Sequence, residues 1–312
     1  MGFAGSDVSG GGERGGVHRI GLVVFGLVLW VGGGVPGAAQ VPGATPLAQF
    51  REATALAVAP GGRFYVADAG HDVVRRFGAD GAPRATLGGS GTRAGEFDGP
   101  RALDPTNGQT LYVADAGNGR VQQFSAEFQY VGALAVGTAT DLGVRQRTFD
   151  DGRDGADVQG TGRPIAVASS DGNDTFVVDA REDHIVRFDA QGRADRLIGP
   201  AGRLDDPVAL AVEKNRRLYV ADRGREGVMV YDLFGTFIER LSLPPLPEVQ
   251  SLSINEGQLW IVSPRRVFVW TPETDTVRRH AVSLDAALVG AAPWEGEILL
   301  LTEHRLYRRP EW

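Results

Sequence analysis

Cysteine is absent from the 312 residues of this sequence. Its absence excludes disulfides, thiolate nucleophiles and thiolate metal sites, and it also excludes a lipoprotein anchored through an N-terminal cysteine. Lysine is almost absent as well, because Lys214 is the only one and every other basic residue is arginine. Together with a net charge of −7, the shortage of lysine argues against a surface that binds nucleic acid.

Only one long apolar run occurs, and it lies near the N-terminus. Arg14 and Arg19 precede the apolar residues 20–31, which are followed by glycines, a proline and small residues up to Ala39. This order is typical of a secretory signal peptide, and we expect residues 1–39 to be removed. An uncleaved membrane anchor remains the alternative. The sequence therefore predicts a periplasmic or secreted protein that meets a membrane only if the segment is retained.

The rest of the sequence repeats a short apolar motif. Six copies occur, at Phe64–Asp68, Leu111–Asp115, Thr175–Asp179, Leu218–Asp222, Leu259–Ser263 and Ile298–Thr302. Apart from one longer gap before the third copy, they recur at roughly the 40–45-residue spacing of a four-stranded propeller blade. Turns containing glycine or asparagine separate the apolar segments, and no segment after residue 39 shows the 3.6-residue period of an amphipathic helix.

These observations predict an all-β fold, a six-bladed β-propeller of four-stranded antiparallel blades over residues 40–312. Alanine-rich segments such as 55–58 and 209–212 precede the motifs, and we expect them to line the narrow centre. The chain ends too soon after Tyr307 to complete the last blade. We therefore expect residues 41–47 to supply its missing strand, which would join the two ends of the ring.

The motifs resemble the NHL repeat. The resemblance rests on the Tyr-Val-Ala-Asp strands, on 116–121 (Ala-Gly-Asn-Gly-Arg-Val) and on 95–100 (Gly-Glu-Phe-Asp-Gly-Pro). It covers about residues 50–310, strongly in four units and weakly in two. It implies a six-bladed propeller. The Asn-x-Arg that follows the motif aspartate in the family is matched only by Asn118 and Arg120, so the resemblance does not carry over a ligand.

The longer gap before the third motif contains an insertion at about 137–162. It is rich in glycine and aspartate and includes Asp151, Asp154 and Asp157. This spacing is similar to a calcium loop but lacks the distal glutamate of the complete pattern. We predict a solvated loop that contacts a partner, with a calcium site as the alternative.

The recurring aspartates and the histidines are the other candidate ligands. The weak repeats replace the aspartate by Ser263 and Thr302, so we expect the carboxylates to accept backbone N–H bonds in loops instead of binding metal. His71, His184 and His304 fall between second and third strands on one face. Surface histidines are the default prediction, and a zinc or catalytic cluster is the alternative.

No nucleophile elbow, zinc-protease motif, phosphate loop or dinucleotide fingerprint is present. The sequence therefore predicts a monomeric, non-enzymatic scaffold outside the cytoplasm that binds a protein, peptide or glycan, with no cofactor. The alternative is a metal-dependent lyase or lactone hydrolase that acts at the central channel.

Overall fold

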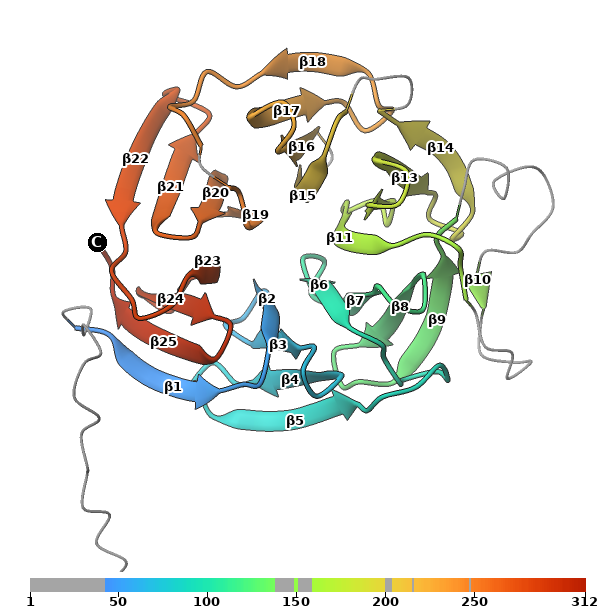
Figure 1. Cartoon of the computed structure of the whole chain (residues 1–312), viewed down its shortest axis with the longest axis horizontal. Helices are drawn as coiled ribbons and strands as arrows, with labels where there is room; N and C mark the ends of the chain where they lie inside the picture. The colour runs from blue at the N-terminus through green and yellow to red at the C-terminus, as the bar shows by residue number, and fades with distance from the viewer. Residues whose placement is uncertain (1–42, 138–148, 151–158, 200–203, 215, 247) are drawn as a thin grey trace, which may run out of the picture. The chain divides into compact units, whose positions relative to one another are not determined.

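A computed structural model describes residues 43–137, 149–150, 159–199, 204–214, 216–246 and 248–312. These residues form six antiparallel sheets arranged in a ring (Figure 1) and contain no helix. Consequently no described segment is a helix that could cross a membrane. The predicted six-bladed all-β fold is confirmed. The predicted signal peptide, residues 1–39, lies outside the described residues.

We number the blades along the chain, and each begins with its innermost strand. Blade 1 comprises β2 (Ala53–Val58), β3 (Phe64–Asp68), β4 (Val73–Phe77) and β5 (Pro83–Gly88). Blade 2 comprises β6 (Pro100–Asp104), β7 (Thr110–Asp115), β8 (Arg120–Ser125) and β9 (Tyr130–Ala135). Blade 3 comprises β11 (Pro164–Ser169), β12 (Thr175–Asp179), β13 (His184–Phe188) and β14 (Ala194–Ile198).

The second half of the ring repeats this order. Blade 4 comprises β15 (Pro207–Glu213), β16 (Arg217–Asp222), β17 (Gly227–Tyr231) and β18 (Phe237–Arg240). Blade 5 comprises β19 (Ser251–Asn255), β20 (Gln258–Ser263), β21 (Arg266–Thr271) and β22 (Thr276–Ala281). The C-terminal part of the chain gives blade 6 only three strands: β23 (Leu288–Trp294), β24 (Glu297–Thr302) and β25 (Arg305–Pro310).

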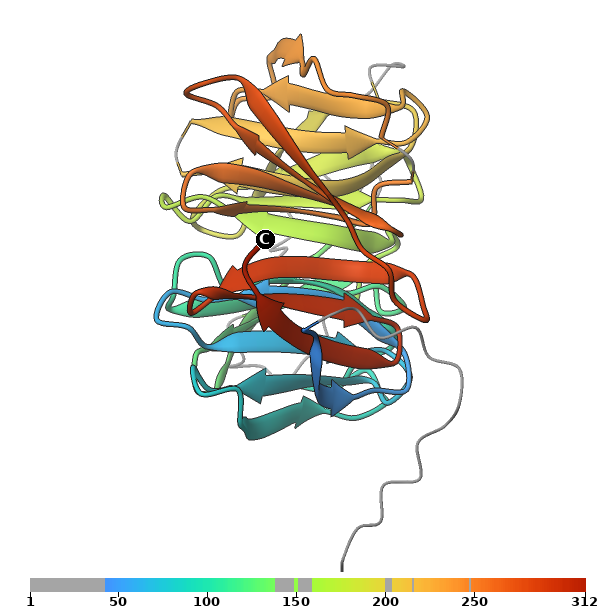
Figure 2. The same cartoon turned by 90° about the vertical axis from the view of Figure 1, so that its left-hand side faces the viewer.

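The N-terminal strand β1 (Thr45–Gln49) completes blade 6. It pairs antiparallel with β25, from Thr45 opposite Arg308 to Gln49 opposite Arg305 (Figures 1 and 2). The predicted closure by the N-terminal segment is therefore confirmed, although the strand begins and ends a few residues later than the predicted 41–47. Joining both ends of the chain in one sheet removes the open edge that β25 would otherwise present.

The insertion adds a strand that the sequence did not predict. β10 (Phe149–Asp150) pairs with β9, which gives blade 2 a fifth strand at its outer edge (Figure 1). The predicted solvated loop is thus wrong for these two residues, because their backbone joins the sheet. Asp151, Asp154 and Asp157 lie outside the described residues.

Each second strand is buried on both faces, and its side chains alternate between two blade interfaces. In β3, Phe64 and Val66 pack with Leu299 and Leu301 of blade 6, whereas Tyr65 packs toward blade 2. All of these side chains are at most 1% exposed. Successive side chains of a strand point to opposite faces, so a strand between two neighbouring blades is apolar at every position.

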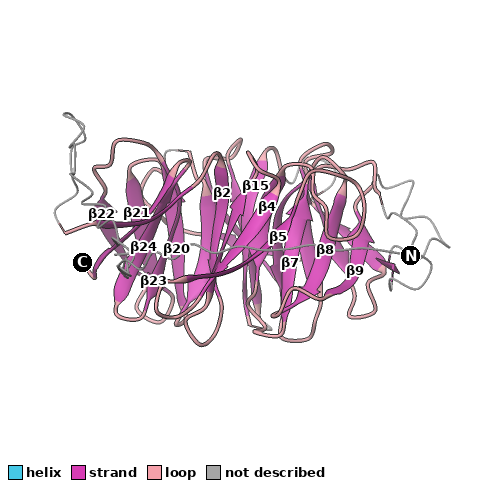
Figure 3. Ribbon diagram, turned by 90° about the horizontal axis from the view of Figure 1, so that it is seen from below, coloured by secondary structure: helices cyan, strands magenta, loops and turns pink. Residues whose placement is uncertain are grey.

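Loops connect the strands on both faces of the ring (Figure 3). We call one face the aspartate face, because each second strand ends there in its motif residue. Each first strand begins on the same face, and in blade 1 this places Ala53 opposite Asp68. The hairpins between first and second strands lie on the opposite face, which we call the turn face. There Glu256–Gly257 and Glu295–Gly296 adopt the predicted positive φ, as tight hairpins require.

Candidate functional site

The motif aspartates fasten the loops of the aspartate face. Asp68 accepts N–H bonds from Arg51 and Glu52 at 3.2 and 3.0 Å, and Asp115 accepts one from Asp98 at 2.8 Å. Asp179 and Asp222 make equivalent bonds. The prediction that these carboxylates bind backbone N–H groups is confirmed. Most donors, however, belong to the segment that leads into the first strand and not to the loop after the second.

In blade 2 this pattern grows into a buried polar network. Asp115 also accepts hydrogen bonds from Asn118, Arg120 and Gln122 at 2.9, 2.9 and 3.1 Å. Arg120 is 1% exposed, and its guanidinium donates in addition to the main-chain oxygens of Arg93 and Glu96. The Asn-x-Arg segment that follows the Asp115 motif is therefore a structural clamp, in which the Asp115 carboxylate accepts hydrogen bonds from Asp98, Asn118, Arg120 and Gln122.

The central channel is narrow, and most of the residues that line it are aliphatic. In five blades the first strand carries a β-bulge at its start, on the aspartate face, and the bulged residues are Thr54, Arg101, Ile165, Val208 and Val289. Bulges re-aim a side chain and often lie beside active sites. On the turn face the channel holds a cavity of only about 80 Å³. The bulged residues lie at the other end of the channel, which we call the channel mouth.

Asp104 is the one carboxyl group that lines the channel cavity on the turn face. Burial raises the pKa of this carboxyl group, although hydrogen bonds from Ser169 and Thr106 oppose the shift. Asp104 Oδ2 accepts from the Ser169 N–H and hydroxyl, both at 2.5 Å, and Oδ1 accepts from the N–H and hydroxyl of Thr106. These hydrogen bonds come from Thr106, close to Asp104 in the chain, and from Ser169 of β11, so Asp104 links blade 2 to blade 3.

The three candidate histidines do not converge. His71 is half-exposed and contacts Asp68 at 2.8 Å, and His304 contacts the main-chain oxygen of Arg51 at 3.0 Å. His184 is 5% exposed in blade 3, and its Nε2 has no hydrogen-bond partner among the described residues. His71 and His304 thus flank the same segment, around Arg51, while His184 lies two blades away. The predicted face is correct, but the structure does not bring the three together.

The described residues do not fit a metal centre. No group of three or more His, Asp or Glu side chains is placed to hold one cation within the parts of the chain that the structure describes. A catalytic zinc needs three protein ligands, and calcium needs six or more oxygens. The candidate aspartates of the insertion, Asp151, Asp154 and Asp157, are outside the described ranges.

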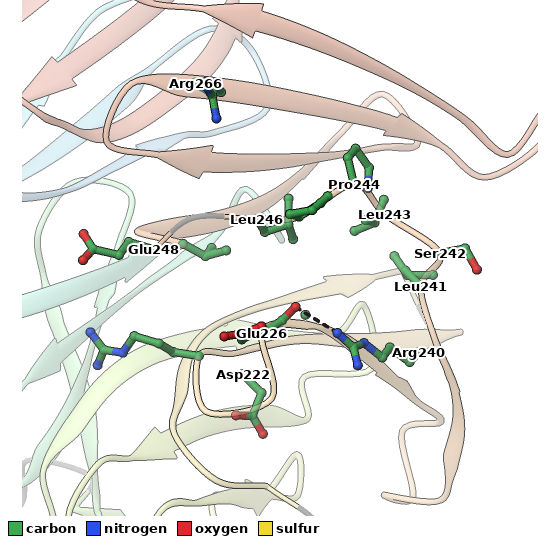
Figure 4. Close-up of a pocket in the computed structure, with 14 residues that line it drawn as sticks. Asp222, Glu226, Arg240, Leu241, Ser242, Leu243, Pro244, Leu246, Glu248 and Arg266 are labelled. Atoms are coloured by element: carbon green, nitrogen blue, oxygen red, sulfur yellow. Dashed lines mark hydrogen bonds between the residues drawn. The ribbon is translucent and has the colours of Figure 1, made fainter.

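A large groove lies on the aspartate face between blades 4 and 5 (Figure 4). Its volume is about 920 Å³. One wall is the segment that joins the blades, including Leu243, Pro244 and Leu246; the other carries Asp222, Glu226 and Arg240. Arg240 donates a 3.0 Å hydrogen bond to the Glu226 main-chain oxygen, so its charge is held at the wall. The mixture of apolar and oppositely charged walls selects no single ligand chemistry.

A second pocket on the same face, between blades 2 and 3, has a cavity volume of about 480 Å³. Three arginines line it: Arg101, Arg163 and Arg181. Asp98 is the single carboxylate of the lining, and three of its glycines belong to closely packed loops. Because Arg101 is a bulged residue of β6, this pocket opens beside the channel mouth.

Comparisons with known proteins support the fold. The sequence matches no protein-family model and no curated protein. Solved structures with a similar fold include a streptogramin B lyase, at 10% identity and TM-score 0.57 over 86% of this chain and 97% of that one. They also include virginiamycin B lyase from Staphylococcus aureus (9%, 0.58, 85% and 97%) and a putative gluconolactonase (14%, 0.59, 88% and 92%). At these identities the likeness establishes the six-bladed propeller.

Sequence reasoning missed the arginine pocket. Its three arginines fall in no recognisable motif, Arg101 lies far from the other two in the chain, and arginine is so common here that no single one is distinctive. The only signal is the position of Arg101 and Arg163, one directly after and one directly before the proline that opens a first strand. That position places both beside the channel, but it becomes meaningful only once the ring is closed.

Proposed function

We propose that this chain is an enzyme of the lyase or lactone hydrolase class that acts on a small molecule at the channel mouth of the aspartate face. The observation that carries this proposal is the fold likeness to two lyases and a putative gluconolactonase, which extends over nearly their whole length. Of the two functions predicted from the sequence, the comparisons favour this alternative over non-enzymatic binding.

The site itself supports a small ligand more than a large one. The mouth is bordered by bulged residues of adjacent blades, and the arginine pocket beside it has the size of small-molecule sites, typically about 300–1,000 Å³. Cationic side chains at such a mouth can stabilise an oxyanion that develops when a ring is opened. Because the described residues hold no metal-ligand group, we derive no step through a metal.

The test is turnover by the purified protein. Gluconolactone and quinupristin are suitable substrates, since one similar structure is an inactive virginiamycin B lyase holding quinupristin. Product formation is followed by chromatography before and after dialysis against a chelator, with elemental analysis for zinc and calcium. Ile165→Arg and Val208→Arg, which fill the mouth, should abolish turnover, whereas the exposed control Arg279→Gln should not. No ring opening in either compound, with or without added divalent cations, would overturn the proposal.

A second candidate is a non-enzymatic propeller that binds a protein, peptide or glycan. The aliphatic Ile165, Val208 and Val289 at the bulges favour it, because these side chains supply no acid or base for catalysis. Pull-down from an envelope fraction with the full protein and with a variant lacking residues 138–161 tests this candidate. A partner lost with the deletion would place the contact at the insertion.

We also propose that the repeats belong to the NHL type and that the protein is exported as a monomer. The clamp of Asp115, Asn118 and Arg120 supports the first point, because it gives the Asn-x-Arg pattern a structural role. The apolar run at residues 20–31 supports the second. Mass spectrometry of the mature N-terminus, cell fractionation and gel filtration test cleavage, location and oligomeric state.

A further inference from the structure

The arginine pocket between blades 2 and 3 is built by rigid elements. Asp179 Oδ1 accepts the backbone N–H of Arg163 at 2.8 Å and that of Arg181 at 3.0 Å. In addition, the Ala180 N–H donates to the Arg163 main-chain oxygen at 2.9 Å. One buried carboxylate therefore holds the main chains of both arginines next to each other, Arg163 just before β11 and Arg181 just after β12.

The third arginine comes from the neighbouring blade. Arg101 occupies the bulge at the start of β6, so its backbone is fixed by the sheet on either side. Its nearest acidic partner is Glu52, with 3.9 Å between guanidinium and carboxylate, and both side chains are 43% exposed. At that distance and exposure the pairing is weak, which leaves Arg101 able to turn toward a ligand in the pocket.

The positive charges of the pocket's arginines exceed the negative charge of its described acidic residues. Arg163 and Arg181 are exposed, and neither guanidinium forms an ion pair or hydrogen bond with a described residue. With three arginines against Asp98, the described residues of the lining carry two net positive charges on a chain of net charge −7. Planar guanidinium groups match carboxylate and phosphate oxygens in bidentate fashion, so this arrangement selects an oxyanion.

The backbone N–H groups of the pocket's glycines do not contribute to ligand binding. The N–H groups of Gly117, Gly160 and Gly162 already donate to the main-chain oxygens of Asp98, Asn118 and Val136. They are therefore not free to bind an anion as a phosphate loop does. A Cβ on Gly162 would stand 2.5 Å from the Asp179 carboxylate, so a larger residue there would displace the group that fixes Arg163 and Arg181.

We infer that this pocket binds a small organic molecule through a carboxylate or phosphate group held by Arg101, Arg163 and Arg181. The rest of the molecule extends toward the channel mouth, because Arg101 borders both. This inference names the chemical class of the substrate or product of the proposed enzyme. Binding of the oxyanion is argued from the arginines alone, and only the identification of that oxyanion as substrate or product rests on the proposed function. A lactone hydrolase would release such a carboxylate, since hydrolysis of the ring leaves a hydroxy acid.

Calorimetric titration of the full-length protein with inorganic phosphate and, separately, with gluconate tests the inference at low ionic strength. Each should bind, and binding should weaken as salt is added. Arg163→Gln with Arg181→Gln should reduce affinity by at least about tenfold, the effect of one lost charge-assisted hydrogen bond. The matched control, Arg196→Gln with Arg279→Gln, removes two exposed arginines from outer strands and should leave affinity unchanged.

The outcomes separate this inference from the proposed function. Binding that is lost in the Arg163/Arg181 variant but kept in the control upholds the inference, even if no lactone is opened. The exchange of both residues for lysine should give intermediate affinity, because charge is kept and the bidentate fork is lost. Equal affinity in all variants, or no binding of either anion by the wild type, overturns the inference even if ring opening occurs. Preference for phosphate or gluconate decides which oxyanion the pocket is built for.

Discussion

The buried clamp in blade 2 makes a quantitative prediction about stability. Asp115→Ala removes the carboxylate that faces Arg120, whose side chain is 1% exposed. The guanidinium would keep its bonds to the main-chain oxygens of Arg93 and Glu96 but lose its 2.9 Å ion pair with the Asp115 carboxylate. Asn118 and Gln122 would also lose an acceptor. Arg120 lies too deep to reach water without opening the blade.

Breaking a buried ion pair by removing one partner costs about 3–5 kcal/mol, because an uncompensated charge stays buried. For a domain of this size each kcal/mol lowers the melting temperature by roughly 2–4 °C. We therefore expect Asp115→Ala to lower it by about 6–20 °C. Arg120→Met should cost less, since the Asp115 carboxylate keeps its bonds from Asp98, Asn118 and Gln122.

Thermal unfolding followed by circular dichroism measures these differences, with Asp80→Ala as the control. Asp80 pairs with Arg84 on the surface, where both side chains are at least half-exposed, and its removal should leave the melting temperature almost unchanged. Adding Arg120→Met to Asp115→Ala should recover part of the loss. If Asp115→Ala is no more damaging than Asp80→Ala, the clamp does not hold the blade as argued.

Three further predictions test other parts of the ring. Deleting residues 43–49 removes β1, with its four paired residues and the half-buried Leu47, and should lower the unfolding free energy by roughly 3–5 kcal/mol; an unchanged denaturation midpoint would refute closure by this strand. Asp104→Asn should change how stability depends on pH. Because the folded-state pKa of Asp104 is raised, its contribution is complete below the ordinary carboxyl pKa and is lost as pH rises through the folded-state pKa. The stability of the wild type relative to Asp104→Asn should therefore fall across that window, and a constant difference would contradict the raised pKa. Gly117→Ala places a Cβ 2.8 Å from the Asp98 main-chain oxygen and should cost about 1–3 kcal/mol in urea unfolding, whereas no loss would show that the loop relaxes freely.

The fold could be predicted from the sequence because each blade repeats the same local rules. Apolar second strands such as Phe64–Asp68, glycine-containing hairpins and the recurring spacing each specify part of one blade, and a ring is the arrangement that covers both faces of every blade. The missing strand of blade 6 was predictable for the same reason. β10 was not, because a two-residue strand has no periodicity to detect.

For the candidate site, the sequence predicted only the face of the ring on which the histidines lie. The motif positions correctly place His71, His184 and His304 on the aspartate face, but blade number determines how far apart they lie, and they do not meet. Conversely, Arg101, Arg163 and Arg181 show no pattern in the sequence, yet the structure gathers them at one pocket. Side chains from neighbouring blades meet through ring geometry, which no local motif encodes.

The sequence by itself determined the repeating unit, the number of blades and the closure of the ring, because these follow from turn chemistry and from apolar residues a fixed distance apart. Only the tertiary structure decided which polar groups form hydrogen bonds within the propeller and which remain available to bind a ligand. Asp115 and Asp104 are consumed by internal hydrogen bonds, whereas Arg163 and Arg181 are exposed with no acidic partner among the described residues. The reason is physical: whether a charge is satisfied depends on neighbours in space, and in a propeller most of those neighbours belong to another part of the chain.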